Sequence, residues 1–164
     1  MQNDLSRDIY LVQNPAIGAA ILWRFVCGYY ANENKPVPFP LLFIVLPVVF
    51  REDMCTVIKS TQKRKGLSKV SERLFENKKK DSLYSINSTA IVLRPLTLKA
   101  FSFGISASLF SLDKSTAYVY PLVRTQTSSI SATTKNMLDA AEKLGGWCAE
   151  LSLLEIEKWL KVRF

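Results

Sequence analysis

The sequence has 164 residues, of which 48% are hydrophobic, and its 22 lysine and arginine residues outnumber 14 aspartate and glutamate residues, giving a formal net charge of +8. A chain of this length suits one domain and can bury roughly two thirds of its unfolded surface. Because the sequence contains no histidine, it lacks the Ser-His and Cys-His catalytic couples, the usual zinc ligands and the commonest general base.

The first predicted helix follows a short apolar group at residues 9–12, which could form a strand or an extended lead-in. Asn14 can cap this helix, and Pro15 fits its first turn, where a missing N–H costs nothing, so the helix should begin there and end near Tyr30. Arg24 is its only charged residue. Protein should therefore cover most of its surface, and it is expected to be the central core helix.

A polar, proline-rich connector at residues 32–40 leads to a second apolar segment at residues 41–50, where Pro47 should kink or end a helix. Ten residues are too few to span a bilayer as a helix. Aromatic residues on the first helix more often belong to a core than to an interface, yet so small a chain can hardly cover an apolar helix completely. The predicted partner-binding residues are Trp23, Tyr29, Tyr30, Pro36, Pro38 and Phe39.

These two apolar segments carry a series of short motifs. They are Asn14-Pro15-Ala16, Gly18-Ala19, Leu22-Trp23-Arg24-Phe25, Gly28-Tyr29, Pro40-Leu41-Leu42-Phe43 and Val45-Leu46-Pro47, with a weaker echo in Leu144-Gly145-Gly146-Trp147. The arrangement resembles the middle component of bacterial ABC three-component systems. Members of that family are encoded beside an SMC- or Rad50-like ATPase and an effector, as in Lamassu-type defence. The resemblance implies a role through partners and supplies no site chemistry.

Residues 51–80 predict two short helices joined by a basic turn, an order typical of a helix-turn-helix. Glu52 and Asp53 supply negative charge for the first turn of a helix that ends near Ser60. Ser68 is the expected N-cap of the second helix. The buried face of that second helix should comprise Leu67, Val70, Leu74 and Phe75.

Most of the positive charge lies in residues 61–80, where eight basic residues stand against Glu72 and Glu76, a balance of +6. Several such side chains on one accessible surface can neutralise nucleic-acid phosphates. The predicted DNA-binding residues are Lys63, Arg64, Lys65, Lys69, Arg73, Lys78, Lys79 and Lys80. The alternative is a solvated turn that only keeps the protein soluble, because this predicted surface includes no aromatic residue for stacking on single strands.

A third helix is predicted from about Ser82, and Pro95 should restart or kink it. Its apolar face should comprise Leu83, Ile86, Ala90, Leu93, Leu98 and Phe101. A period near two from Ile105 to Leu112, and a β-branched and aromatic stretch from Thr116 to Tyr120, predict a hairpin with its turn at residues 113–115. This order of elements, helices followed by a small hairpin, is typical of a winged helix.

The rest of the chain predicts a polar surface loop at residues 126–134 and two C-terminal helices. The first should begin near Thr133, with Met137, Leu138, Ala141 and Leu144 on its inner face. Gly145-Gly146 could end it, although the resemblance implies that it continues to Trp147 and Cys148. Ser152 with Glu155 three residues later is a capping-box pattern for the last helix.

Cysteine usage and motif content argue against further site chemistry. Cys27, Cys55 and Cys148 are odd in number and far apart, which suits buried thiols in a reducing compartment. No Cys-x-x-Cys and no glycine-rich phosphate loop occurs, so we predict no cofactor, no metal and no ATP hydrolysis. The start of the chain is polar and shows no secretion signal, so the expected location is the cytoplasm.

The predicted fold is a single, mostly α, α+β domain over residues 1–164, of winged-helix type. Its predicted parts are a helical core at 14–60, a basic helix-turn-helix-like part at 51–80, a helix and hairpin wing at 82–122, and C-terminal helices at 133–162.

The expected function is that of a non-catalytic accessory subunit. The resemblance implies that it docks or bridges an SMC/Rad50-like ATPase and an effector nuclease in an anti-phage or anti-plasmid complex. Double-stranded DNA is a further candidate partner, contacted without sequence preference, and a membrane is not. The alternative is a stand-alone winged-helix DNA-binding regulator. An adjacent ATPase gene would favour the subunit, whereas isolation or an adjacent promoter target would favour the regulator.

Overall fold

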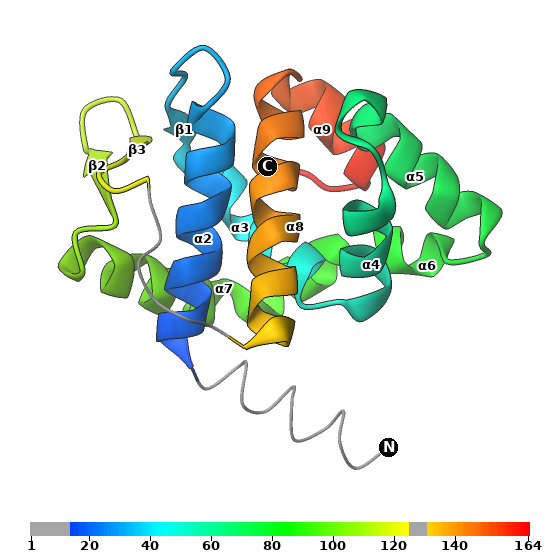
Figure 1. Cartoon of the computed structure of the whole chain (residues 1–164), viewed down its shortest axis with the longest axis horizontal. Coiled ribbons are helices and arrows are strands. Elements are labelled where there is room, and N and C mark those ends of the chain that lie inside the picture. The colour runs from blue at the N-terminus through cyan, green and yellow to red at the C-terminus, as the bar shows by residue number, and fades with distance from the viewer. Residues whose placement is uncertain (1–13, 125–130) are drawn as a thin grey trace.

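The computed structural model describes residues 14–124 and 131–164, which form a mostly helical body with one small antiparallel sheet (Figure 1). This confirms the predicted mostly helical α+β class, while the winged-helix arrangement stays a prediction. The apolar group at residues 9–12 and most of the predicted loop at 126–134 lie outside the described residues.

The described elements are two 3₁₀ helices, three strands and the α-helices labelled in Figure 1. In chain order they are α2 (Pro15–Tyr30), β1 (Val37–Pro38), η1 (Phe39–Leu41), α3 (Leu42–Val49), α4 (Glu52–Ser60), η2 (Lys63–Lys65), α5 (Gly66–Glu76), α6 (Lys80–Tyr84), α7 (Ile86–Ser106), β2 (Phe110–Asp113), β3 (Tyr118–Pro121), α8 (Ala132–Ala149) and α9 (Leu153–Leu160).

Helices α2 and α8 stand side by side at the centre of the molecule (Figure 1). The predicted cap of α2 is confirmed, because the Asn14 side chain accepts hydrogen bonds from the backbone N–H groups of Ala16 and Ile17 at 3.1 and 3.3 Å. The predicted end at Tyr30 is confirmed as well. The chain's own elements cover most of α2, so its apolar surface needs less completion by a partner than the sequence predicted.

The central pair meets backbone to backbone at two glycines. A Cβ added to Gly28 would lie 2.0 Å from the carbonyl oxygen of Glu142, and one added to Gly145 would lie 2.2 Å from the carbonyl oxygen of Phe25. At neighbouring Gly146 the nearest atom would be 3.7 Å away, an ordinary contact. The glycine pair therefore does not end α8, which continues through Trp147 to Ala149 as the resemblance implied.

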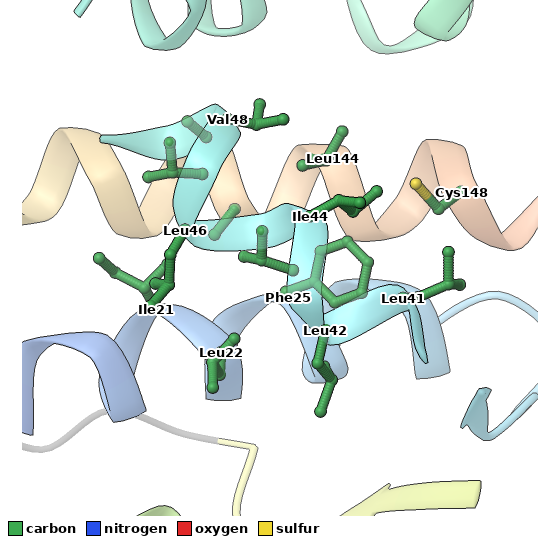
Figure 2. Close-up of a cluster of buried hydrophobic side chains, with 14 of the residues drawn as sticks. Ile21, Leu22, Phe25, Leu41, Leu42, Ile44, Leu46, Val48, Leu144 and Cys148 are labelled. Carbon is green, nitrogen blue, oxygen red and sulfur yellow. The ribbon is translucent and has the colours of Figure 1, made fainter. Parts of the chain in front are cut away.

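Helix α3 closes one side of this pair and supplies much of the core. Figure 2 shows its side chains, Leu42 and Leu46 among them, gathered with Ile21 and Phe25 of α2 and Leu144 of α8. Pro47 lies inside α3, and the helix ends two residues later at Val49. The proline therefore lies in the last turn of α3, and the helix ends within a few residues of it, as predicted.

The predicted hairpin is present as β2 and β3, and β1 extends it to a sheet with the order β1-β3-β2. Its turn is confirmed by Asp113, whose Oδ1 accepts a hydrogen bond from the Ser115 N–H at 2.9 Å. The predicted strand start at Ile105 is wrong, because α7 continues to Ser106. The chain leaves the helix only at Ser108, which has a positive φ of 56°.

Helix α7 runs without a break from Ile86 through Pro95, so of the two outcomes predicted at the proline the restart is wrong, while a kink stays a prediction. The real interruption lies earlier, at Ser85 between α6 and α7. At the end of the chain the predicted capping box is confirmed. The Ser152 N–H donates to Glu155 Oε2 at 2.8 Å, and the Glu155 N–H donates to Ser152 Oγ at 3.3 Å.

Candidate functional site

The predicted DNA-binding residues lie at one end of the molecule, along η2, α5 and the start of α6 (right in Figure 1). Residues 63–65 are exposed on η2, and residues 78–80 are exposed at the far end of α5. An eleven-residue helix rises roughly 16 Å, so the two groups are separated rather than clustered. We call the surface residues of this set the basic strip: Lys63, Arg64, Lys65, Lys69, Lys78, Lys79 and Lys80.

Arg73 is not part of this strip, because its guanidinium turns toward the end of α4. Its Nη1 donates to Ser60 Oγ at 2.9 Å and to Thr61 Oγ1 at 2.8 Å. Lys69 Nζ donates to Glu72 Oε2 at 2.6 Å, and this hydrogen bond raises the pKa of Lys69 above its usual value. Lys69 therefore stays protonated, but the carboxylate of Glu72 offsets part of its positive charge.

Helix α8 holds the start of the basic strip in place. Lys143 Nζ donates to the backbone carbonyls of Ile58, Lys59 and Thr61 at 3.2, 2.7 and 2.9 Å, which satisfies the last carbonyls of α4. Burial lowers the pKa of Lys143. One turn further along, Trp147 Nε1 donates to the Lys63 carbonyl at 2.7 Å. Both contacts fix the backbone that leads into η2.

We expect Lys143→Met to lower the free energy of unfolding by about 2 kcal/mol, because three carbonyls lose a charged donor. Lys135→Met, at an exposed position near the start of the same helix, should change it by less than about 0.5 kcal/mol. Urea denaturation of both variants measures the difference. Equal midpoints for the two variants would mean that the Lys143 contacts contribute nothing to stability.

A cleft of about 390 Å³ lies between α5 and α9, beside the basic strip. The residues that line it are Lys65, Ser68, Lys69, Ser71, Glu72, Phe75, Trp159 and Lys161. The predicted burial of Phe75 is wrong, since it is 40% exposed. Helix α5 begins at Gly66, without the predicted Ser68 cap, and buries Leu67, Val70 and Leu74. On the helix, the side chain of Phe75 is rotated by about 100° from that of Leu74. It therefore lies at the edge of the face that Leu67, Val70 and Leu74 bury.

The predicted partner-binding residues fall into two groups. Trp23 and Tyr29 are only 5% and 8% exposed, and Trp23 Nε1 donates to the Val123 carbonyl at 2.6 Å, so both belong to the core of this chain. The other four, Tyr30, Pro36, Pro38 and Phe39, are half-buried at the surface. Phe39 packs against Phe101 of α7, with ring centroids 5.0 Å apart. The connector therefore lies against α7.

Helix α7 presents apolar residues to solvent, which the sequence analysis did not predict. We call them the outer α7 face: Ile91, Val92, Leu98, Phe103 and Ile105, all exposed. The predicted burial of Leu98 is therefore wrong. A signal was available, because a 21-residue helix with apolar residues on every side and two charges, Arg94 and Lys99, has more apolar surface than one core can cover. A cleft of about 210 Å³ joins this face to the connector at Pro40.

The thiols are poor candidates for chemistry. Cys55 and Cys148 are buried, Cys27 is half-buried, and none of the three forms a disulfide bond. Burial raises the pKa of Cys27 to about 11 and that of Cys148 to about 12, so both thiols are protonated near neutral pH.

Within residues 14–124 and 131–164, no three histidine, cysteine, aspartate or glutamate side chains are grouped so that they could bind a metal ion. Nor does any helix in them combine the length and hydropathy needed to cross a bilayer.

Comparison with known proteins identifies the family. A family model described as ABC-three component (ABC-3C) system Middle Component 3 matches residues 2–164. No curated protein and no solved structure matched the chain. The family match covers nearly the whole chain, including the glycine contacts and the basic strip, and it confirms the resemblance to middle components. The chain belongs to the ABC-three component (ABC-3C) system Middle Component 3 family.

Proposed function

We propose that this protein is a non-catalytic, cytoplasmic accessory subunit that docks an SMC/Rad50-like ATPase and an effector nuclease in a Lamassu-type defence complex. The observation that carries the proposal is the family match over residues 2–164, since a middle component works together with the other components of its system. The absence of histidine from the sequence and the raised thiol pKa values support a role through binding rather than through catalysis.

The outer α7 face and the adjoining connector are the proposed docking surface for the ATPase. Interface cores are rich in apolar and aromatic residues, and this face exposes five such side chains on one helix. Ile91, Leu98 and Ile105 recur every seven residues, the spacing at which an apolar stripe packs along a partner helix. Pro36, Pro38 and Phe39 are the proposed second part of this docking surface, since they are half-buried and Phe39 packs against Phe101 of the same helix.

Sequence-independent contact of the basic strip with duplex DNA is the second part of the proposal. The η2 residues are exposed, and their backbone is held by Trp147 and Lys143, so three charges are presented from one fixed turn. The outward side chains of α5 include Glu72 and Glu76, which disfavour insertion of this helix into a groove. Contacts to DNA phosphates therefore fit this arrangement better than the base contacts that a DNA-binding regulator would make.

Coexpression with the ATPase and effector encoded nearby tests the docking. Ile91→Asp, at a residue 62% exposed on the seven-residue stripe of α7, should release the ATPase, because it places a charge in an apolar interface. Leu154→Asp is the control, at a residue 76% exposed on α9. Co-purification and circular dichroism report binding and folding. If both variants retain the ATPase, docking lies elsewhere, and if the unaltered protein retains neither partner, the proposed role is wrong.

A further inference from the structure

The cleft between α5 and α9 combines positive charge with aromatic rings. Lys65 and Lys69 reach it from η2 and α5, and Lys161 reaches it from the end of α9. Phe75 and Trp159 line the same cleft from opposite helices. Its volume of about 390 Å³ lies in the range of pockets that hold small ligands, roughly 300–1,000 Å³.

The aromatic residues form a row that continues past the cleft. The Phe75 ring meets the Tyr84 ring edge-on, with centroids 6.4 Å apart, and Tyr84 is well exposed at the end of α6. Trp159 lies half-buried at the other end of the row. Every nucleobase offers a flat face that can stack on such rings. The middle member of this row, Phe75, lies on α5, the helix that the basic strip follows.

The charges of the cleft suit a phosphate group. Three lysines line it against one carboxylate, Glu72, which is already paired with Lys69 at 2.6 Å. Lys161 ends α9 in the left-handed region, with a φ of 56°. Glycine or asparagine would adopt this conformation at lower cost, so the geometry of the helix end does not explain a lysine there.

We propose that this cleft binds an unpaired nucleotide of a nucleic-acid strand. Its base stacks on Trp159 and Phe75, and its phosphates are held by Lys65, Lys69 and Lys161. The inference rests on the proposed nucleic-acid contact of the basic strip and deepens it, because it adds a preference for single strands over duplexes. The hydroxyl group of Ser68 in the lining is available to a sugar or phosphate oxygen.

Fluorescence anisotropy of labelled oligonucleotides tests the proposal on the full-length protein. The ligands are an oligothymidylate and an oligouridylate of about 12 nucleotides, a duplex of the same length, and free thymidine monophosphate as competitor. Quenching of intrinsic fluorescence gives a second readout, because Trp23 and Trp147 are buried and Trp159 is more exposed than either. The DNA and RNA strands distinguish the two sources of unpaired nucleotides.

We expect Trp159→Leu, which keeps an apolar side chain against the core, to weaken single-strand binding about tenfold and to leave duplex binding unchanged. Trp159→Phe should retain most of the affinity. Lys161→Ser should lower the single-strand salt slope by about 0.7, the contribution of one phosphate. Tyr118→Ala, at an exposed aromatic residue of β3, is the control and should change neither affinity.

Three outcomes would overturn the inference. The first is single-strand affinity unchanged by Trp159→Leu, and the second is an equal loss for single strands and duplexes in the same variant, which would indicate that Trp159 contacts no unpaired base. In both cases, duplex binding that still depends on residues 63–65 would leave the proposed DNA contact intact. The third is no binding of any oligonucleotide, which would overturn the DNA contact as well, while co-purification with the ATPase would still support the accessory role.

Discussion

Gly145→Ala should lower the free energy of unfolding by about 3 kcal/mol or more, whereas Gly146→Ala should leave it unchanged or raise it slightly. At Gly145 the new methyl group would lie 2.2 Å from the Phe25 carbonyl oxygen and 2.9 Å from the Tyr29 nitrogen. Both obstacles are backbone atoms of α2, so no side-chain rotation can relieve the clash and the central helices must move apart. A domain of this size has only about 5–15 kcal/mol of total stability.

Denaturant unfolding of the two variants measures this difference under identical conditions. Gly146→Ala controls for helix propensity, because it makes the same chemical change one residue further along α8, where the nearest atom would be 3.7 Å away. Gly28→Ala, whose new methyl group would lie 2.0 Å from the Glu142 carbonyl oxygen, should behave like Gly145→Ala. Equal stability of the Gly145 and Gly146 variants would show that α2 and α8 are not as close as described.

Reversal of the three η2 charges, Lys63, Arg64 and Lys65 to Glu, should lower the slope of log affinity against log salt by about two to three for duplex DNA. Each neutralised phosphate contributes about 0.9 to that slope. The loss should be equal for unrelated sequences, because phosphate contacts carry no base information. The change should leave the fold intact, since Trp147 binds the backbone carbonyl of Lys63 and not its side chain.

Binding is measured for the isolated protein and for the assembled complex, on two unrelated duplexes at several salt concentrations. The control variant reverses Lys99, Lys114 and Lys135, which are exposed on other elements, and so makes the same change in net charge. A slope that falls equally in both variants would assign the effect to overall charge. A slope that changes in neither would assign the basic strip to solubility or to an acidic protein surface. A strong preference for one duplex would favour the regulator.

Local signals explain which parts of the fold could be predicted from sequence. The start of α2 depends on Asn14 and its nearest neighbours, and the start of α9 depends on the pair Ser152 and Glu155. The sequence signal for each of these helix starts therefore lies within four residues. The hairpin turn is likewise set by Asp113 and its neighbour Ser115. Features of this kind need no knowledge of the rest of the molecule.

The missed features depend on residues far apart in the chain. Trp159 and Lys65 line one cleft although 94 positions separate them (159 minus 65), and nothing near either residue indicates this. Lys143 lies on α8, and only the packing of the helices places its Nζ against the carbonyls at the end of α4. The apolar face predicted for α7 included Leu98, whereas the exposure of Leu98 depends on how much of the helix surface the other elements cover.

The glycine contact between α2 and α8 also restricts how this sequence can evolve. A side chain that grows at one position of a core is often accommodated when a facing side chain shrinks. Gly28 and Gly145 have no such facing side chain, because each meets the other helix at a carbonyl oxygen, which every residue type carries. No second substitution can restore the fit. Both positions therefore admit glycine alone as long as α2 and α8 keep their present spacing.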